Sequence, residues 1–427
     1  MTSLYMAMIL FCFVVLYVVV IHDTGPFTAV AIFGVVNSLM AVGTLLQLDS
    51  SIRADQVHAA VVVWTAVAFT LGAIAQSRRL GRRANHRAPS VVIIHAGRGT
   101  LTLFGISTIV AIAYFAIAGS AFMMSVQATL WGQPLTAAEV ATQRLSAYSG
   151  DRYLFPGYVN QVKNVLLPGL FLVISADWIR RRRGLGVAII GLVVVLVLLG
   201  TGQRGPFVIA AITGVTFLYW LRGGRLERPA RLAIILGVVG FLIATIMTGR
   251  VAISDEIVSS ARAGFEGMLD RVLLQQQEAS VAAFRYIYER PTSWGREWLQ
   301  GLLGLLPGVK GSGLANEVFA TMYGSDRGTA PPSLWGSIYH NFGSIGVAIA
   351  PFLLATALSR ITNRALGREE RNTVELAGIC GVFVVMGFWA GGGGIDQLLN
   401  YGIAIWALMW WYGSRLHGRS RTFEADV

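Results

Sequence analysis

The amino-acid sequence predicts an all-α polytopic membrane protein with about eleven transmembrane helices and one large extracytoplasmic loop. The composition supports this class, because 55% of the 427 residues are hydrophobic and only 13% are charged. A soluble domain carries roughly 25% charged residues. Apolar runs of about 20 residues, the length that crosses a bilayer as a helix, recur along the whole chain. We therefore expect a single integral membrane domain over residues 1–427.

The apolar runs give the approximate positions of the spans. They lie near residues 2–21, 27–47, 58–76, 101–124, 164–179, 185–201, 205–221, 231–249, 343–359, 373–390 and 398–413. No Lys or Arg precedes Arg53, so the first run lacks the charged region that opens a signal peptide. We expect this run to be retained as a span.

Arginine clusters indicate which span ends face the cytoplasm. They follow spans three, five, seven and nine and close the chain: Arg78, Arg79, Arg82, Arg83, Arg87, Arg180 to Arg183, Arg222, Arg225, Arg228, Arg231, Arg360, Arg364, Arg368, Arg371, Arg415, Arg419 and Arg421. All fall on one side of the membrane, and short basic loops face the cytoplasm. The N-terminus is then outside and the C-terminus inside. Because topology accounts for the net charge of +12, we expect no nucleic-acid partner.

Two segments are too long to be turns, and this topology places both outside the cytoplasm. They cover residues 125–163 and 250–342. The second has apolar residues at helical spacing: Ile257, Ala261, Phe265, Met268, Leu269, Val272 and Leu273, then Val281, Phe284 and Tyr288. This spacing predicts amphipathic helices that lie on the membrane surface or, equally, pack on the spans. Long loops of this kind are where we expect function.

Arg204 is the first candidate site residue. It lies between spans six and seven on the outer face, and Pro206 suits the first turn of the next helix. A helix N-terminus and an arginine fork both favour phosphate oxygens. The alternative is an arginine that extends to the lipid headgroups.

His340 is the second candidate, where the large loop meets span nine. Its side chain could accept a proton from a sugar hydroxyl near neutral pH, and Asn341 could orient it or the substrate. The alternative is an interfacial histidine bonded to the backbone. His58 is the other histidine at the outer face. It has no polar partner that the sequence indicates, and we interpret it as a packing residue.

Further outer charges could neutralise a diphosphate or bind sugar hydroxyls, although each is more often a solvated charge or an ion-pair partner. Arg250 ends span eight, just before Asp255 and Glu256. The shorter outer loop contains Arg144, Asp151, Arg152 and Lys163.

Several classes of site have no sequence support. There is no Walker loop, no Asp-x-Asp pair on either face and no zinc-ligand spacing, so we expect no nucleotide, metal or other cofactor. Cys12 and Cys380 lie inside apolar runs. Ionisable residues are almost missing from the predicted spans, which argues against an ion-coupled transporter but does not exclude a lipid flippase.

Three segments resemble the Wzy-type polymerases of bacterial surface polysaccharides, also described as oligosaccharide repeat unit polymerases. Residues 201–205 (TGQRG) resemble the Gly-x-Arg-Gly hairpin of this family, and residues 333–346 resemble its Tyr-x-Asn-Phe-Gly-x-x-Gly motif. Residues 298–310 resemble its Ile-Pro-Arg…Lys loop segment, but Gly308 stands where many relatives carry arginine, which leaves Lys310 as the only cation. The His340–Asn341 pair is also similar to a motif of the related O-antigen ligases.

The resemblance implies a GT-C-like glycosyltransferase of the bacterial inner membrane whose active site faces the periplasm. It would join repeat units carried on undecaprenyl diphosphate, with a lipid-linked donor and acceptor, the bilayer, and a chain-length regulator and a flippase as partners. In this interpretation Arg204, Arg250 and Arg285 bind the diphosphate, and His340 is the base, with Glu256 as its substitute. The expected substrate-binding residues are Arg144, Arg152, Lys310, Tyr339 and Asn341.

Three alternatives remain open. An O-antigen ligase would share the fold and differ in its acceptor. A transporter or flippase of lipid-linked oligosaccharides would need polar residues along cavities at the middle of the membrane. A structural membrane subunit of an envelope complex would leave Arg204 and His340 free to vary.

Overall fold

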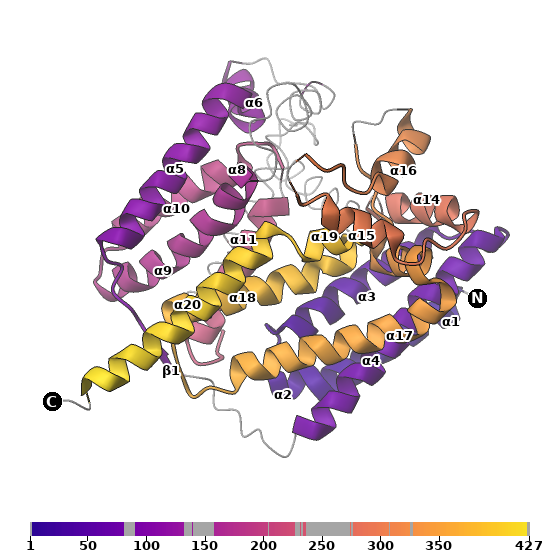
Figure 1. Cartoon of the computed structure of the whole chain (residues 1–427), viewed down its shortest axis with the longest axis horizontal. Coiled ribbons are helices and arrows are strands. Elements are labelled where there is room, and N and C mark those ends of the chain that lie inside the picture. The colour runs from indigo at the N-terminus through magenta and orange to yellow at the C-terminus, as the bar shows by residue number, and fades with distance from the viewer. Residues whose placement is uncertain are drawn as a thin grey trace, which may run out of the picture. The chain divides into compact units, whose positions relative to one another are not determined.

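The structure is a computed structural model that describes residues 2–80, 90–131, 139, 158–203, 205–226, 231, 234–235, 274, 276–306, 308–324 and 328–424. Helices make up most of it (Figure 1). Seven helical segments in this part of the chain are long and apolar enough to span a membrane: Ser3–Ile21, Ala29–Gln47, Arg53–Ser77, Arg98–Ala118, Tyr158–Arg180, Ser333–Leu366 and Thr373–Gly391. The predicted class, a helical polytopic membrane protein, is confirmed.

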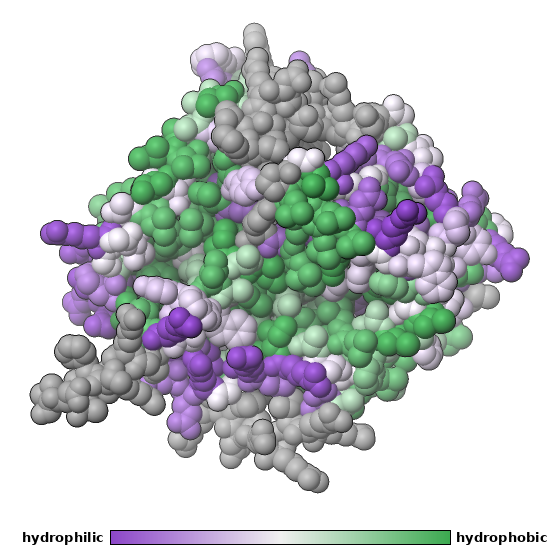
Figure 2. Space-filling model, viewed as in Figure 1, coloured by the Kyte–Doolittle hydropathy of each residue, from purple (hydrophilic) through white to green (hydrophobic). Residues whose placement is uncertain are grey.

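The surface agrees with this class. Figure 2 shows hydrophobic side chains over large areas of the visible face. Side chains such as Ile109, Leu185 and Ile345 are 66%, 78% and 69% exposed. Soluble monomers rarely expose continuous apolar patches, whereas lipid tails are a suitable environment for them. The exposed apolar side chains are therefore explained by a lipid-facing surface.

The chain divides into two compact units. Unit 1 comprises Met1–His86, Leu269–Gly367 and Phe383–Asn400, and unit 2 comprises Arg87–Met268, Arg368–Val382 and Tyr401–Val427.

Unit 1 contains the N-terminal helices and the described part of the large loop. Its elements are α1 (Thr2–Leu16), η1 (Tyr17–Ile21), α2 (His22–Thr24), α3 (Ala29–Gln47), α4 (Arg53–Leu80), α14 (Gln276–Tyr288), α15 (Arg296–Leu303), α16 (Leu314–Tyr323), α17 (Ser333–Leu366), η4 (Trp389–Gly391) and α19 (Ile395–Leu398). Thr28 caps α3, because its hydroxyl accepts a hydrogen bond from the Ala31 N–H at 3.3 Å. The predicted amphipathic helix at Val281, Phe284 and Tyr288 is confirmed as α14.

Helices α4 and α17 lie side by side and run in the same direction (Figure 1). Near their N-terminal ends, the Trp335 indole donates a hydrogen bond to His58 Nε2 at 3.0 Å. Further along, a Cβ added at Gly72 would lie 2.5 Å from the Phe352 carbonyl oxygen, so glycine permits the close approach. The arginines at the C-terminal ends of both helices therefore lie at one end of unit 1: Arg78, Arg79, Arg360 and Arg364. Helices α14, α15 and α16 gather at the opposite end.

Helix α17 changes direction at Gly343, whose φ of 61° and ψ of −157° are not helical. A residue with a Cβ would be strained there. The predicted span at 343–359 starts at this break, whereas the apolar helical segment of the structure is longer and covers Ser333–Leu366.

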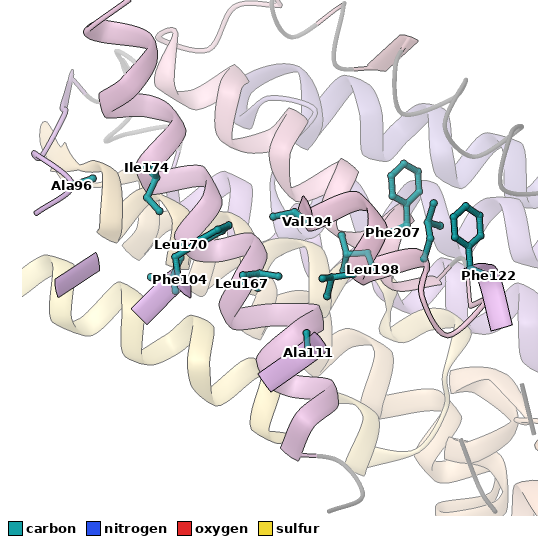
Figure 3. Packing of buried hydrophobic residues seen from close by; sticks show 12 residues of the cluster. Ala96, Phe104, Ala111, Phe122, Leu167, Leu170, Ile174, Val194, Leu198 and Phe207 are labelled. Atoms are coloured by element: carbon teal, nitrogen blue, oxygen red, sulfur yellow. The ribbon is translucent and has the colours of Figure 1, made fainter. Parts of the chain in front are cut away.

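Unit 2 contains β1 (Ser90–Val92), α5 (Arg98–Ala118), α6 (Ala121–Leu130), α8 (Tyr158–Gln161), η2 (Val162–Leu166), α9 (Leu167–Arg180), α10 (Gly184–Leu199), α11 (Gly205–Leu221), β2 (Glu370–Asn372) and α20 (Tyr401–Glu424). Helix α18 (Thr373–Phe388) begins in unit 2, and the boundary with unit 1 falls within it. Strands β1 and β2 pair in parallel. A core cluster that includes Leu167, Leu198 and Phe207 packs α5, α9, α10 and α11 together (Figure 3).

The predicted span positions can be compared with these helices. The span at 373–390 is confirmed by Thr373–Gly391. The run at 205–221 is helical, as α11, but this helix is shorter than the seven candidate spans. The span at 101–124 was wrong at its end, because α5 stops at Ala118 and Gly119 adopts a φ of 83° before α6 begins. The run at 231–249 lies almost entirely outside the described residues.

Candidate functional site

Asn341 is the centre of a hydrogen-bond network that joins α15 to α17. Its side chain is 0% exposed. Its Oδ1 accepts from the Ser293 hydroxyl at 2.9 Å and from the Trp298 N–H at 3.3 Å. Its Nδ2 donates to Glu297 Oε2 and to the Ser337 carbonyl, each at 2.9 Å. Because the whole amide is used within the protein, this geometry favours a positioning role for Asn341 over direct contact with substrate.

Further bonds extend this network along α15. Glu297 Oε1 accepts from the Ser312 hydroxyl at 2.7 Å. The Trp298 indole donates to Ser337 Oγ at 2.7 Å, and its ring meets Phe342 edge-on with centroids 5.1 Å apart. Neither Glu297 nor Ser293 was identified from the sequence, and no sequence signal links Glu297 to a residue 44 positions later.

His340 directly precedes Asn341, and a hydrogen bond to the His340 backbone holds it to Ser293. Its carbonyl oxygen accepts from the Ser293 N–H at 2.8 Å. The His340 residue is half-buried, and its Nδ1 is a buried atom with no hydrogen-bond partner within the described part of the chain. The charges of Glu297, Arg290 and Glu317 act on the ring. An imidazole whose backbone is held beside acidic and basic groups can take or give a proton.

An exposed cluster on α14 and α16 supplies two of these charges. Glu317 Oε2 accepts from the Tyr286 hydroxyl at 2.9 Å and from Arg290 Nη1 at 3.2 Å. The Arg290 guanidinium also lies 3.9 Å from the centre of the Tyr286 ring. Burial and the neighbouring Glu317 raise the pKa of the Tyr286 hydroxyl. The cluster binds α14 to α16.

Asp396 on α19 adds a second carboxyl beside α15. A Cβ added at Gly301 would lie 3.1 Å from Asp396 Oδ1, so glycine leaves room for this carboxyl. Burial raises the pKa of Asp396 above its ordinary value of 3.8, and the charge of Glu297 raises it further. The carboxyl therefore holds a proton to higher pH than a solvated aspartate does.

Substitution of Asp396 tests this environment. A carboxyl whose pKa is higher in the folded than in the unfolded protein stabilises the fold below its unfolded pKa, and this contribution is lost as the pH rises through the folded pKa. Part of the stability should therefore be lost as the pH rises above 3.8. We expect Asp396→Asn to remove this loss and to unfold at a higher temperature than wild type at about pH 7.

The measurement is tryptophan fluorescence during thermal unfolding in detergent, from about pH 3.5 to about pH 8. Asp49→Asn is the control, because hydrogen bonds from Ser51 lower the pKa of that exposed carboxyl. The assignment fails if Asp396→Asn and wild type show the same pH dependence.

A second buried network holds α14 against α4. Arg285 donates from Nε and Nη2 to the two carboxylate oxygens of Asp55, at 2.8 and 2.7 Å. Asp55 is 1% exposed, whereas the Arg285 side chain is 43% exposed. The pKa of Arg285 is raised, chiefly by its hydrogen bonds to Asp55. Since this carboxylate already offsets its charge, Arg285 is a weaker candidate for a diphosphate than an arginine without such a partner.

The interpretation of His58 requires a correction. The ring stacks on Phe284 with centroids 4.1 Å apart, so the predicted packing role is confirmed. The expectation that His58 has no polar partner was wrong, because its Nε2 accepts the hydrogen bond from the Trp335 indole. The bond was not predictable, since Trp335 lies 277 positions away in the sequence.

The spans contain more ionisable groups than expected. Asp55 and Lys163 lie inside the span helices Arg53–Ser77 and Tyr158–Arg180, because these helices begin earlier than the apolar runs at 58–76 and 164–179. His58 is the first residue of the run at 58–76. Lys163, expected in an outer loop, is 0% exposed within η2 and donates to Asn164 Oδ1 at 2.9 Å. This finding weakens the argument against a transporter.

The remaining predicted residues fall into two groups. Tyr339 is half-buried with its ring 5.1 Å from Phe284, and Lys310 is exposed in the segment after α15. The others lie outside the described residues: Arg204, Arg250, Glu256, Arg144 and Arg152. In the part of the chain that the structure describes, no group of three or more His, Cys, Asp or Glu could hold a metal ion.

A comparison of the chain with protein-family models, with curated proteins and with solved structures finds no match.

Proposed function

We propose that this chain is a membrane glycosyltransferase that polymerises oligosaccharide repeat units carried on polyprenyl diphosphate. The observation that carries the proposal is the His340–Asn341 pair. The Asn341 amide is bonded to α15, the His340 carbonyl is bonded to Ser293, and the buried Nδ1 of the His340 imidazole has no hydrogen-bond partner in the described structure. An imidazole whose backbone is held beside carboxyl and guanidinium groups suits proton transfer from a sugar hydroxyl.

The proposed reaction balances as follows. A hydroxyl oxygen of the acceptor repeat unit attacks the anomeric carbon of the donor and forms the new glycosidic bond. The bond from that carbon to the diphosphate oxygen breaks, and polyprenyl diphosphate leaves with the electron pair. His340 takes the hydroxyl proton. Arginine N–H groups near the bilayer surface stabilise the charge on the leaving diphosphate, a role assigned from the sequence to Arg204 and Arg250.

The arrangement of unit 1 supports a definite orientation. The arginines that end α4 and α17 lie at one end of the unit, and His340 lies at the other with α14, α15 and α16. Basic ends face the cytoplasm. We infer that the His340 end faces the periplasm of a bacterium, that the protein lies in the inner membrane, and that the N-terminus is outside and the C-terminus inside. About eleven spans and a GT-C-like fold belong to the same proposal.

Complementation of a strain that lacks the gene tests the proposal. With wild type, gels of the surface polysaccharide should show a ladder, and the empty strain should show single repeat units. We expect His340→Ala and Arg204→Ala to reduce the ladder by about 100-fold or more, the range for loss of a catalytic base or of a charge-stabilising donor. Arg225→Ala, at an exposed arginine of the predicted cytoplasmic cluster, is the matched control and should restore it.

Other outcomes assign the alternatives. Long chains that remain on the lipid carrier in the empty strain would indicate a ligase. Repeat units trapped on the cytoplasmic side would indicate a transporter. A normal ladder from both variants at matched membrane levels would show that His340 and Arg204 are not catalytic.

A further inference from the structure

Helix α15 and the turns after it expose an unusual row of apolar side chains. Leu299, Leu303, Leu306 and Val309 are 58%, 45%, 53% and 44% exposed. Leu299 and Leu303 lie four residues apart on one face of the helix, and Leu306 follows in the turns that continue it. Val309 comes next in the sequence after Gly308, whose φ is 78°. Trp294, just before the helix, is 79% exposed.

The opposite face of α15 is occupied by the protein. Glu297 and Gly301 lie roughly half a turn away from Leu299 on a helix of about 3.6 residues per turn. Glu297 bonds to Asn341, and Gly301 is buried beside Asp396. Glu297 and Gly301 therefore hold one face of the helix inward, and Leu299 and Leu303 face outward beside the exposed Gln300.

Two observations indicate what covers this row. First, Trp298 of α15 meets Phe342, and the residues that follow Phe342 on α17 form a lipid-facing row in which Ile345 and Ile349 are 69% and 51% exposed. The start of α15 is thus in contact with the residue that comes just before the exposed apolar side chains of α17.

Second, the row is bordered by groups that suit lipid headgroups. Arg296 and Lys310 are exposed at its two ends, and their charges complement lipid phosphates. Tryptophan, here Trp294, is enriched at membrane–water interfaces.

We propose that the apolar row of α15 inserts into the outer leaflet of the bilayer, with Trp294, Arg296 and Lys310 at the headgroups. The helix is then held between lipid on one side and the Asn341 network on the other. This gives α15 the first of the two arrangements that were predicted for other helices of the large loop, which is to lie on the membrane surface. The inference does not depend on the proposed reaction, but it would place His340 at the level where a lipid diphosphate lies.

Spin labels test the proposal in the full-length protein. Leu299→Cys, Leu303→Cys and Leu306→Cys would each be labelled with a nitroxide in nanodiscs of phosphatidylethanolamine and phosphatidylglycerol. Cys12 and Cys380 are free but buried, so wild type measures the background labelling. Glu289→Cys, at an exposed polar position at the end of the loop helix α14, is the matched control.

We expect collisions with oxygen to exceed collisions with a water-soluble nickel chelate at all three leucine positions, and the reverse at Glu289. A higher collision rate with the nickel chelate at the leucine positions would overturn the proposal. Low accessibility to both reagents with an immobilised label would also overturn it, because a second copy or another protein would then cover the row. Since no turnover is measured, each result stands whether or not the chain is a polymerase.

Discussion

An Asn341→Ala variant is expected to lose polysaccharide polymerisation and to unfold at a lower temperature than wild type. The Asn341 side chain is 0% exposed, and its amide oxygen and amide nitrogen together make four hydrogen bonds. The substitution removes all four. It leaves Glu297 and the Trp298 N–H without this partner. Each buried polar group left unpaired costs about 1–3 kcal/mol, so we expect a loss of about 3 kcal/mol in the free energy of unfolding of unit 1.

The two buried cysteines provide the measurement. A thiol-reactive dye reports on unit 1 through Cys12 and on unit 2 through Cys380 as each becomes exposed on heating. Asn363→Ala, on the same helix, is the matched control, and a change of about 0.5 kcal/mol or less is expected there. If Asn341→Ala kept both its melting temperature and its activity, the network would not be what holds His340 in place.

The second large effect is expected from Arg285→Ala. This variant leaves the Asp55 carboxylate, 1% exposed, without its bidentate partner. Breaking a buried ion pair costs about 3–5 kcal/mol. Because the Arg285 side chain is 43% exposed, we discount this to about 2–3 kcal/mol.

Two matched variants separate charge from packing at this pair. Asp55→Asn should cost less than Arg285→Ala, because the freed guanidinium can reach solvent whereas the freed carboxylate cannot. The double variant Asp55→Asn, Arg285→Gln removes both charges and should recover part of the loss. The same thiol-reactive measurement compares all three. Equal destabilisation by both single variants, with no recovery in the double variant, would contradict a buried-charge explanation.

These variants also separate the two roles considered for Arg285. If it only positions α14 against α4, the double variant should regain polymerisation along with stability. If it also binds the diphosphate, as the resemblance implies, activity should stay low in a stable protein. The structure gives Arg285 a carboxylate partner and thereby favours the positioning role.

The class of fold could be predicted from the sequence because spans are defined locally. An apolar run of sufficient length must become a helix in a bilayer, since each backbone polar group must bond within its own segment. This is why the run at 205–221 matches α11. The errors occur where hydropathy carries no information about the backbone. At Gly119 an apolar run continues through a turn, and before Leu167 the helix begins earlier, at Tyr158, in a segment that buries Lys163.

The candidate site was predicted only in part for a similar reason. The His340–Asn341 pair could be identified because it is a short local motif at the start of a span. The partners that fix it, Glu297 and Ser293, lie more than 40 positions earlier and have no distinctive sequence context. Pairs such as Asp55 and Arg285, 230 positions apart, depend on how α14 packs on α4, which local patterns do not encode.

The most direct test of the central claim uses the purified protein in proteoliposomes with a polyprenyl-diphosphate-linked repeat unit as its only substrate. If the protein is a polymerase, a ladder of lipid-linked oligomers forms without nucleotide sugar. One polyprenyl diphosphate is released for each bond formed, and His340→Ala abolishes both products. If the repeat unit only changes leaflet, or stays unchanged while the protein remains folded, the chain is not a polymerase.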